Sequence, residues 1–210
     1  MIIVMGIPRS GTSVMVEALR KNGYYPGGKR YLIGRKYPSE LAFMKDAHIA
    51  ALSFHGNAWG FYRWDDLVLP LQQSLKAVNQ FIIEEGINVV KDNYLPPFYH
   101  CWCHLNDDFQ NAKVIRTRRN LREASKSMVR LQSSLGRKPR SVNSQLKLNR
   151  LYNRVQGDLL QYIDHVEVWH EDMVKEPKKT ENEIAEYLGH DFDLSIISQK
   201  ETWKHNKRAN

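Results

Sequence analysis

The stretch that decides the fold is IIVMGIPRSGTS, residues 2–13. Its apolar beginning, residues 2–5, predicts a buried strand that ends at Gly6. After this stretch, apolar residues recur at helical spacing, at Val14, Met15, Ala18 and Leu19. They predict a helix that ends at Asn22-Gly23. A glycine-rich turn between a buried strand and an amphipathic helix points backbone N–H groups and the positive end of the helix dipole at one spot. The stretch therefore predicts a strand–loop–helix unit that binds a phosphate or sulfate.

The rest of the chain repeats this alternation of strands and helices. Further buried strands are predicted over residues 87–90, 112–115 and 166–169. Helices are predicted over residues 40–53 with Ser39 as the cap, over 64–85, after Pro96-Pro97, after Leu121, after the loop 136–140, and over 181–188. Strands separated by helices are typical of a parallel sheet. We expect one domain over residues 1–210, a three-layer α/β/α fold with a central parallel sheet, and a basic tail over 200–210.

Positive charge is concentrated in one part of the chain. The 210 residues carry a net charge of +8. Residues 113–154 hold thirteen lysines and arginines against one acid, Glu123, which gives this segment a net charge of +12. Such a concentration attracts anions, among them polyphosphates, nucleic acid, acidic sugars and anionic lipid.

Composition excludes several classes of protein. No apolar run reaches the roughly 18 residues that a transmembrane helix needs, and Gly6 interrupts the N-terminal apolar run too early for a signal peptide. Two cysteines, Cys101 and Cys103, are too few for a disulfide framework. We therefore expect a cytoplasmic protein with no membrane span. The sequence leaves the oligomeric state open.

The glycine-rich loop differs from that of ATP-binding proteins at one position. Its glycine spacing matches the Walker pattern, but Thr12 stands where that pattern has an invariant lysine. The cation is Arg9, inside the loop. An ATPase or kinase that must hold β- and γ-phosphates would lack its usual lysine, which disfavours this class of enzyme.

The segment PRSGTS, residues 8–13, resembles the phosphosulfate-binding loop of sulfotransferases that use 3′-phosphoadenosine 5′-phosphosulfate (PAPS). That family writes the loop as P-[KR]-[ST]-G-[ST]-[ST] and has a P-loop NTPase-like α/β fold. The resemblance implies that the 5′-phosphosulfate is held by Arg9, Ser10, Gly11, Thr12 and Ser13.

A second anion site is predicted in the basic segment. Arg119 lies where a predicted strand ends at the carboxyl edge of the sheet, and Ser127 lies eight residues further on, away from the apolar stripe of the following helix. An arginine fork with a hydroxyl is a good phosphate receptor. The order resembles the 3′-phosphate motif of the same family, with Arg119 and Ser127 in the binding positions and Arg118 as the alternative. The segment HEDMVKEP, residues 170–177, resembles a further family motif that is more structural than catalytic.

Transfer of a sulfuryl group needs a cation on that group and a base for the proton of the acceptor. Lys91 follows the strand predicted over 87–90, and the resemblance assigns it the contact with the transferring group. The cytosolic branch of the family has a catalytic histidine where this chain has Asn93. Other branches place a glutamate at a helix start after the first helix, which makes Glu40 the expected base, with Asp92 and His48 as alternatives. A purely structural role for Glu40, in the first turn of a helix, also remains open.

The sequence thus predicts a sulfotransferase that moves a sulfuryl group from PAPS to a hydroxyl or amine, on a small molecule, a glycan or another acceptor, and releases 3′,5′-adenosine bisphosphate. The alternatives are a P-loop kinase and a non-catalytic protein that binds nucleotides or nucleic acid, although we expect no nucleic-acid partner. We expect no metal site, because Cys101 and Trp102 of the segment HCWCH belong to the core stripe of a helix. Aromatic residues in 24–37 and 54–64 are candidates for the acceptor pocket or for the core.

Overall fold

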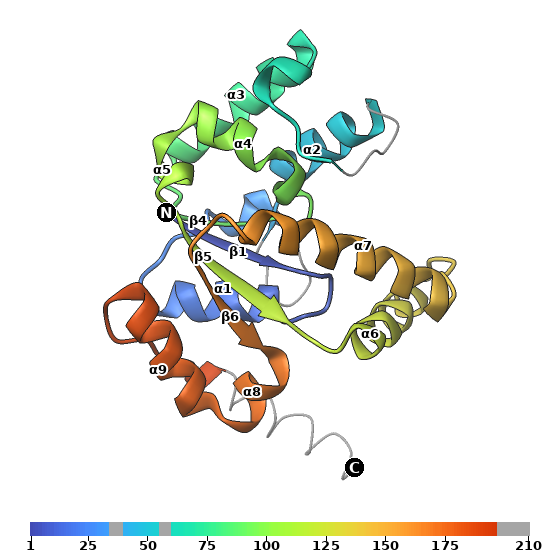
Figure 1. Cartoon of the computed structure of the whole chain (residues 1–210), viewed down its shortest axis with the longest axis vertical. Coiled ribbons are helices and arrows are strands. Elements are labelled where there is room, and N and C mark those ends of the chain that lie inside the picture. Colours follow the sequence, from blue (N-terminus) through green and yellow to red (C-terminus); the bar gives the residue numbers. More distant parts are fainter. Residues whose placement is uncertain (34–39, 55–59, 197–210) are drawn as a thin grey trace.

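The computed structural model describes residues 1–33, 40–54 and 60–196 of the chain (Figure 1). The strands in this part are β1 (Ile2–Gly6), β2 (Leu32–Ile33), β3 (Glu40–Leu41), β4 (Val89–Lys91), β5 (Lys113–Arg118) and β6 (His165–Trp169). The α-helices are α1 (Thr12–Lys21), α2 (Ala42–Phe54), α3 (Leu69–Glu84), α4 (Leu95–Leu105), α5 (Asp107–Gln110), α6 (Leu121–Ser134), α7 (Val142–Leu160), α8 (His170–Lys175) and α9 (Pro177–Leu188). Two short 3₁₀ helices are η1 (Lys29–Tyr31) and η2 (Trp64–Asp66).

The central sheet is parallel, as the alternation of strands and helices predicts. Its strand order is β4-β1-β5-β6, so the glycine-ended β1 lies inside the sheet between β4 and β5. Because every neighbouring pair is parallel, all four strands end at the same edge. The residues that end them there are Gly6, Lys91, Arg118 and Trp169.

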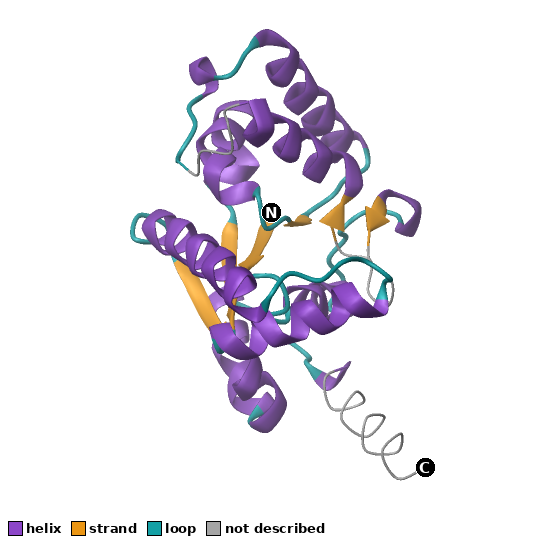
Figure 2. Cartoon of the chain, turned by 90° about the vertical axis from the view of Figure 1, so that its right-hand side faces the viewer, coloured by secondary structure: helices purple, strands orange, loops and turns teal. Residues whose placement is uncertain are grey.

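Helices cover both faces of this sheet, which confirms the three-layer α/β/α prediction (Figures 1 and 2). Side chains of β1 alternate between the two faces. Ile3 and Met5 join a core formed with α2, α3, α4 and the end of α7, whereas Ile2 and Val4 join a second core formed with α1, α8 and α9. Both cores use fully buried apolar side chains, so the layers fix the position of the loop that follows β1.

The structure corrects one local prediction that concerns Glu40. Residues 40–53 were expected to form one helix, but Glu40 lies in β3, which pairs antiparallel with β2 (Ile33 opposite Glu40), and α2 begins at Ala42. The first-turn role considered for Glu40 is therefore wrong, because the residue precedes the helix. The predicted cap Ser39 lies outside the described residues, as does the basic tail 200–210.

Other elements differ from their predicted bounds for visible reasons. The strand predicted over 112–115 continues to Arg118, because Arg116 and Arg118 both pair with Glu167 on the neighbouring β6. The helix predicted over 64–85 is divided into η2 and α3. No helix in the described part of the chain is both long and apolar enough to cross a membrane.

Candidate active site

The loop between β1 and α1 has the backbone of an anion site. Arg9 has φ +75° and is, among the described residues, the one non-glycine residue with a positive φ. Such a strained conformation is typical of functional loops. Gly11 (φ +104°) precedes α1 without a side-chain cap, and the first turn of α1 holds no acid. The positive end of this helix therefore faces the loop without a competing carboxylate.

Ser10 links the loop to the neighbouring strand β5 and also braces the loop internally. The buried hydroxyl of Ser10 donates to the backbone oxygen of Ile7 (2.8 Å) and lies 2.8 Å from the hydroxyl of Thr117. A Cβ atom on Gly6 would lie 2.7 Å from the backbone oxygen of Thr117, so no other residue fits there. In this structure Ser10 braces the loop, and its backbone N–H also donates to Ile7 (3.1 Å). Thr117, which the sequence analysis missed, is part of the same brace.

The two predicted anion sites lie next to each other. The Nε atom of Arg9 donates to the Oγ of Ser127 (3.1 Å), and Nη1 of Arg119 donates to the backbone oxygen of Arg9 (3.1 Å). Ser127 is held there by α6, whose N-terminus is capped by the Asn120 side chain. The fold thus brings Arg9 into contact with Arg119 and Ser127, which both lie more than 100 positions away in the sequence.

Positive charge accumulates at this junction. Partial burial and the charges of Arg119 and Arg130 lower the pKa of the Arg9 guanidinium. The Nε of Arg119 is buried and has no hydrogen-bond partner among the described residues. A bound anion would relieve the repulsion and accept this unused donor.

The geometry also separates Arg119 from its alternative. Arg118 donates to Glu167 (2.7 Å) and lies over the ring of Trp169 (4.7 Å to the centroid), so its side chain is committed to β6. Arg119 points instead toward the loop. The residue one position after the strand end is therefore the one whose side chain contacts the glycine-rich loop.

The predicted catalytic pair lies at the same edge of the sheet. Lys91 ends β4, and its Nζ is 3.4 Å from the Oε1 of Glu40, with both side chains buried. The other carboxylate oxygen of Glu40 accepts from Lys45 at 2.8 Å. Glu40 Oε1 is buried and has no hydrogen-bond partner among the described residues, so one oxygen of this carboxylate is able to accept a proton.

Lys45 is a member of this cluster that the sequence analysis did not assign. It lies on α2, five positions after Glu40. Burial lowers the pKa of the Lys45 ammonium, but the Glu40 carboxylate outweighs burial, and the net shift is upward. A lysine only five positions after a candidate acid was the signal in the sequence that could have indicated this ion pair.

The two alternative bases are committed to each other. His48 Nδ1 lies 2.6 Å from Asp92 Oδ2, and Trp102 donates its indole N–H to His48 Nε2 (2.8 Å). The second oxygen of Asp92 accepts from the backbone N–H of Tyr94. Burial raises the pKa of the Asp92 carboxyl, but the charge interaction with His48 and the hydrogen bonds from His48 and Tyr94 outweigh it, and the net shift is downward. Both ring nitrogens of His48 and both oxygens of Asp92 thus have partners, whereas Glu40 Oε1 has no hydrogen-bond partner among the described residues and lies 3.4 Å from the Lys91 ammonium.

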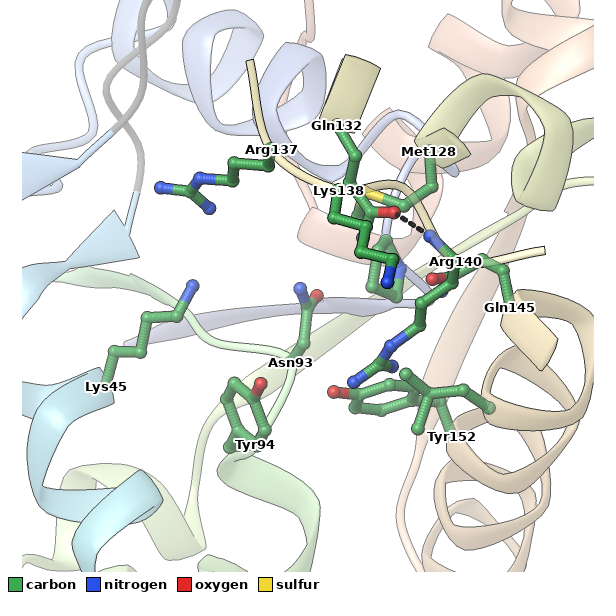
Figure 3. A pocket seen from close by; sticks show the side chains of 12 residues that line it. Lys45, Asn93, Tyr94, Met128, Gln132, Arg137, Lys138, Arg140, Gln145 and Tyr152 are labelled. Atoms are coloured by element: carbon green, nitrogen blue, oxygen red, sulfur yellow. Dashed lines mark hydrogen bonds between the residues drawn. The ribbon is translucent and has the colours of Figure 1, made fainter. Parts of the chain in front are cut away.

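A cavity of about 300 Å³ opens beside this cluster (Figure 3). It is lined by Pro8 of the loop, by Lys45, Asn93 and Tyr94, and by residues of α6, α7 and the segment between them. The described parts of the aromatic segments proposed for an acceptor pocket do not line this cavity, although Phe61 lines another one. Tyr31 packs against Phe81 and Tyr62 stacks on Phe98 in the core, whereas residues 34–37 and 55–59 lie outside the described residues.

The cysteine–histidine segment belongs to the core. Cys101 is fully buried and donates its thiol to the backbone oxygen of Tyr62 (3.3 Å), and Trp102 is the partner of His48. Burial raises the pKa of the Cys101 thiol to about 12. The described residues contain no cluster of three histidines, cysteines or acids arranged to hold a metal ion.

The chain also matches the model of a known protein family. A family model described as the sulfotransferase family matches residues 2–193. No curated protein matches the chain.

Solved structures agree in fold at low sequence identity. The sulfotransferase domain from the curacin biosynthetic pathway is 17% identical, with a TM-score of 0.55 over 91% of this chain and 74% of that one. The sulfotransferase domain of the Synechococcus PCC 7002 olefin synthase is 20% identical, with a TM-score of 0.52 over 92% and 74% of the two chains. The sulfotransferase STF9 from Mycobacterium avium is 14% identical, with a TM-score of 0.53 over 98% and 67%. At this identity the likeness concerns the fold, and confirms the P-loop-like prediction.

Proposed function

The chain belongs to the sulfotransferase family, and on that premise we propose that it moves a sulfuryl group from PAPS to a hydroxyl or amine acceptor. The observation that carries the proposal is the meeting of Arg9, Arg119 and Ser127 at the glycine-rich loop. PAPS has two anionic groups, a 5′-phosphosulfate and a 3′-phosphate. A site for it needs two neighbouring anion receptors, which is the arrangement that these residues offer.

The residues fit such a donor. The loop from Arg9 to Ser13, at the uncapped N-terminus of α1, would hold the 5′-phosphosulfate through backbone N–H groups and the Arg9 guanidinium. Arg119 and Ser127 would hold the 3′-phosphate. The buried, unpartnered Nε of Arg119 supports this assignment, because a phosphate oxygen would accept from it. Thr12 in place of the Walker lysine favours this donor over ATP.

Two buried side chains of this chain would carry out the transfer. Bound PAPS supplies the sulfuryl group, and 3′,5′-adenosine bisphosphate is the leaving group. Lys91, at the end of β4, would neutralise negative charge that develops on the transferring group. Glu40 Oε1 would accept the proton of the acceptor hydroxyl or amine, and Lys45 would hold the carboxylate through its other oxygen.

A transfer assay with two labelled donors tests the proposal. The protein is incubated with ³⁵S-labelled PAPS or γ-³²P-labelled ATP and a panel of phenols, sugars and amines. We expect ³⁵S in at least one acceptor and no transfer of ³²P. Transfer of ³²P would replace the proposal by a kinase, and binding of the bisphosphate without transfer to any acceptor would favour a non-catalytic nucleotide-binding protein.

A further inference from the structure

The cavity beside the catalytic cluster is bordered by the segment between α6 and α7 (Figure 3). Pro8 of the anion-binding loop contributes to its wall, and so does Lys45, whose ammonium is 2.8 Å from the Glu40 carboxylate. The lining residues include neither Arg119 nor Ser127. The cavity therefore lies next to the transfer site and apart from the residues assigned to the 3′-phosphate. An acceptor molecule would have to bind in such a place.

The cavity is lined by cations and, among its described lining residues, by no acid. Lys45 and three residues of the α6–α7 segment, Arg137, Lys138 and Arg140, contribute four positive charges. Lys45 shares the carboxylate of Glu40 with Lys91, whereas no described residue forms an ion pair with the other three. In Figure 3 the cationic ends of Lys138 and Arg140 point toward the space beside Asn93 and Tyr152, whereas the Arg137 guanidinium extends toward the side on which Lys45 lies. This wall attracts anions and repels cations.

The floor of the cavity is less polar than this wall. The rings of Tyr94 and Tyr152 meet edge to face there, with centroids 5.9 Å apart, and Met128 and Leu148 lie beside them. The volume of about 300 Å³ is at the small end of ligand pockets. A ring-sized group fits such a floor, with a charged substituent directed at the cations.

We propose that the acceptor is an anion: it carries a carboxylate, sulfate or phosphate that binds Arg137, Lys138 and Arg140 while its hydroxyl or amine lies beside Glu40. This inference rests on the proposed function and names the class of acceptor for the same site. The three cations would thus select the acceptor by charge, and Arg9 and Arg119 would remain dedicated to the donor.

Matched pairs of ligands test the inference without requiring turnover. Protein saturated with 3′,5′-adenosine bisphosphate is titrated with 4-hydroxyphenylacetate and its neutral amide, and with methyl glucuronide and methyl glucoside. Each pair differs in one negative charge, and the two pairs distinguish an aromatic acid from an acidic sugar. We expect at least one anion to bind about tenfold more tightly than its neutral partner, since three exposed ion pairs each contribute little. Neutral ligands that bind as tightly as both anions, or no binding of any of the four, would overturn the inference.

Two charge variants identify the residues responsible. The triple variant Arg137→Gln/Lys138→Gln/Arg140→Gln changes exposed side chains, so we expect it to fold, to lose the preference for the anion and to bind the bisphosphate within twofold of the original protein. A bisphosphate affinity that falls as much as the anion affinity would show that these cations bind the donor, which refutes the inference.

The matched control removes the same charge elsewhere. Lys147→Gln/Arg150→Gln/Arg154→Gln alters exposed cations of α7 that do not line the cavity, and it should keep the preference. Loss of the preference in this control would show that the preference for anions arises from the net charge of the protein, and would overturn the inference. If the protein did not bind the bisphosphate, the proposed function would be refuted instead. The same pairs of charged and neutral ligands, titrated against the unloaded protein, would then still test the inference.

Discussion

Replacement of Glu40 by glutamine removes the proposed base and keeps the size of the side chain. A positioned general base accelerates proton transfer by about 10²–10⁴-fold. We expect turnover of the best acceptor to fall by that factor while the affinity for 3′,5′-adenosine bisphosphate changes less than twofold. Glu40 contacts Lys45 and Lys91, which is assigned to the sulfuryl group that the bisphosphate lacks, and none of the residues assigned to its two phosphates.

The same change also affects stability. Glu40 and Lys91 are only 5% and 7% exposed, so Glu40→Gln leaves a buried ammonium without its counter-charge at a cost of about 3–5 kcal/mol. For a chain of this length that corresponds to a melting temperature lower by about 6–20 °C. A lower melting temperature is therefore expected and does not show that Glu40 is merely structural.

The assay must separate the two effects. Turnover is measured by stopped-time ³⁵S transfer at a temperature at which circular dichroism shows the variant to be fully folded. Asp92→Asn is the control, because it perturbs a neighbouring buried pair without touching the proposed base. We expect this control to melt earlier and to retain turnover within a few-fold. If Glu40→Gln retained turnover to within threefold, or if Asp92→Asn lost as much as Glu40→Gln, the assignment of the base would be refuted.

Three further predictions concern the donor site, the loop and acid stability. Arg119→Ala should weaken binding of the bisphosphate by about 10- to 150-fold, equivalent to about 1.5–3 kcal/mol for charge-assisted hydrogen bonds, and should leave the affinity for 5′-AMP unchanged in calorimetry. An equal loss of bisphosphate affinity in Arg118→Ala would contradict the assignment of Arg119 to the 3′-phosphate. Gly6→Ala should lower the free energy of unfolding by about 1–3 kcal/mol in urea, because its Cβ would collide with backbone, whereas Gly60→Ala, with open space around it, should change it by less than about 0.5 kcal/mol. Because the pKa of Asp92 is lowered in the folded protein, its stabilisation is complete above the ordinary value of 3.8 and is lost as the pH falls through the folded value. Wild-type stability should therefore decrease more steeply below about pH 4 than that of Asp92→Asn in urea titrations at several pH values, and parallel curves would exclude this linkage.

The order of elements could be predicted because it depends on local patterns. Residues 2–13 form a buried strand, a glycine turn and a helix in the structure as in the prediction, since apolar runs and glycines determine each element locally. The failure at Glu40 has the opposite cause. Its strand exists only because β2 pairs with it, which a propensity argument does not include.

The candidate site was predictable in its residue types but not in its contacts. Motif spacing indicated Arg9, Arg119 and Ser127 separately. The hydrogen bond between Arg9 and Ser127, however, joins residues 118 positions apart, and they meet because β1 and β5 are neighbours in the sheet. The pair of His48 and Asp92, 44 positions apart, has no local signal either. Such contacts follow from the packing of layers rather than from sequence periodicity.

The measurement that tests the central claim most directly compares two isomers by isothermal titration calorimetry. Adenosine 3′,5′-bisphosphate and ADP contain the same atoms and differ in the position of one phosphate. If the loop holds the 5′ group and Arg119 with Ser127 holds the 3′ group, the 3′,5′-isomer should bind at least about tenfold more tightly, since one charge-assisted contact is worth about 1.4 kcal/mol or more. Equal or tighter binding of ADP would contradict the account of the donor site.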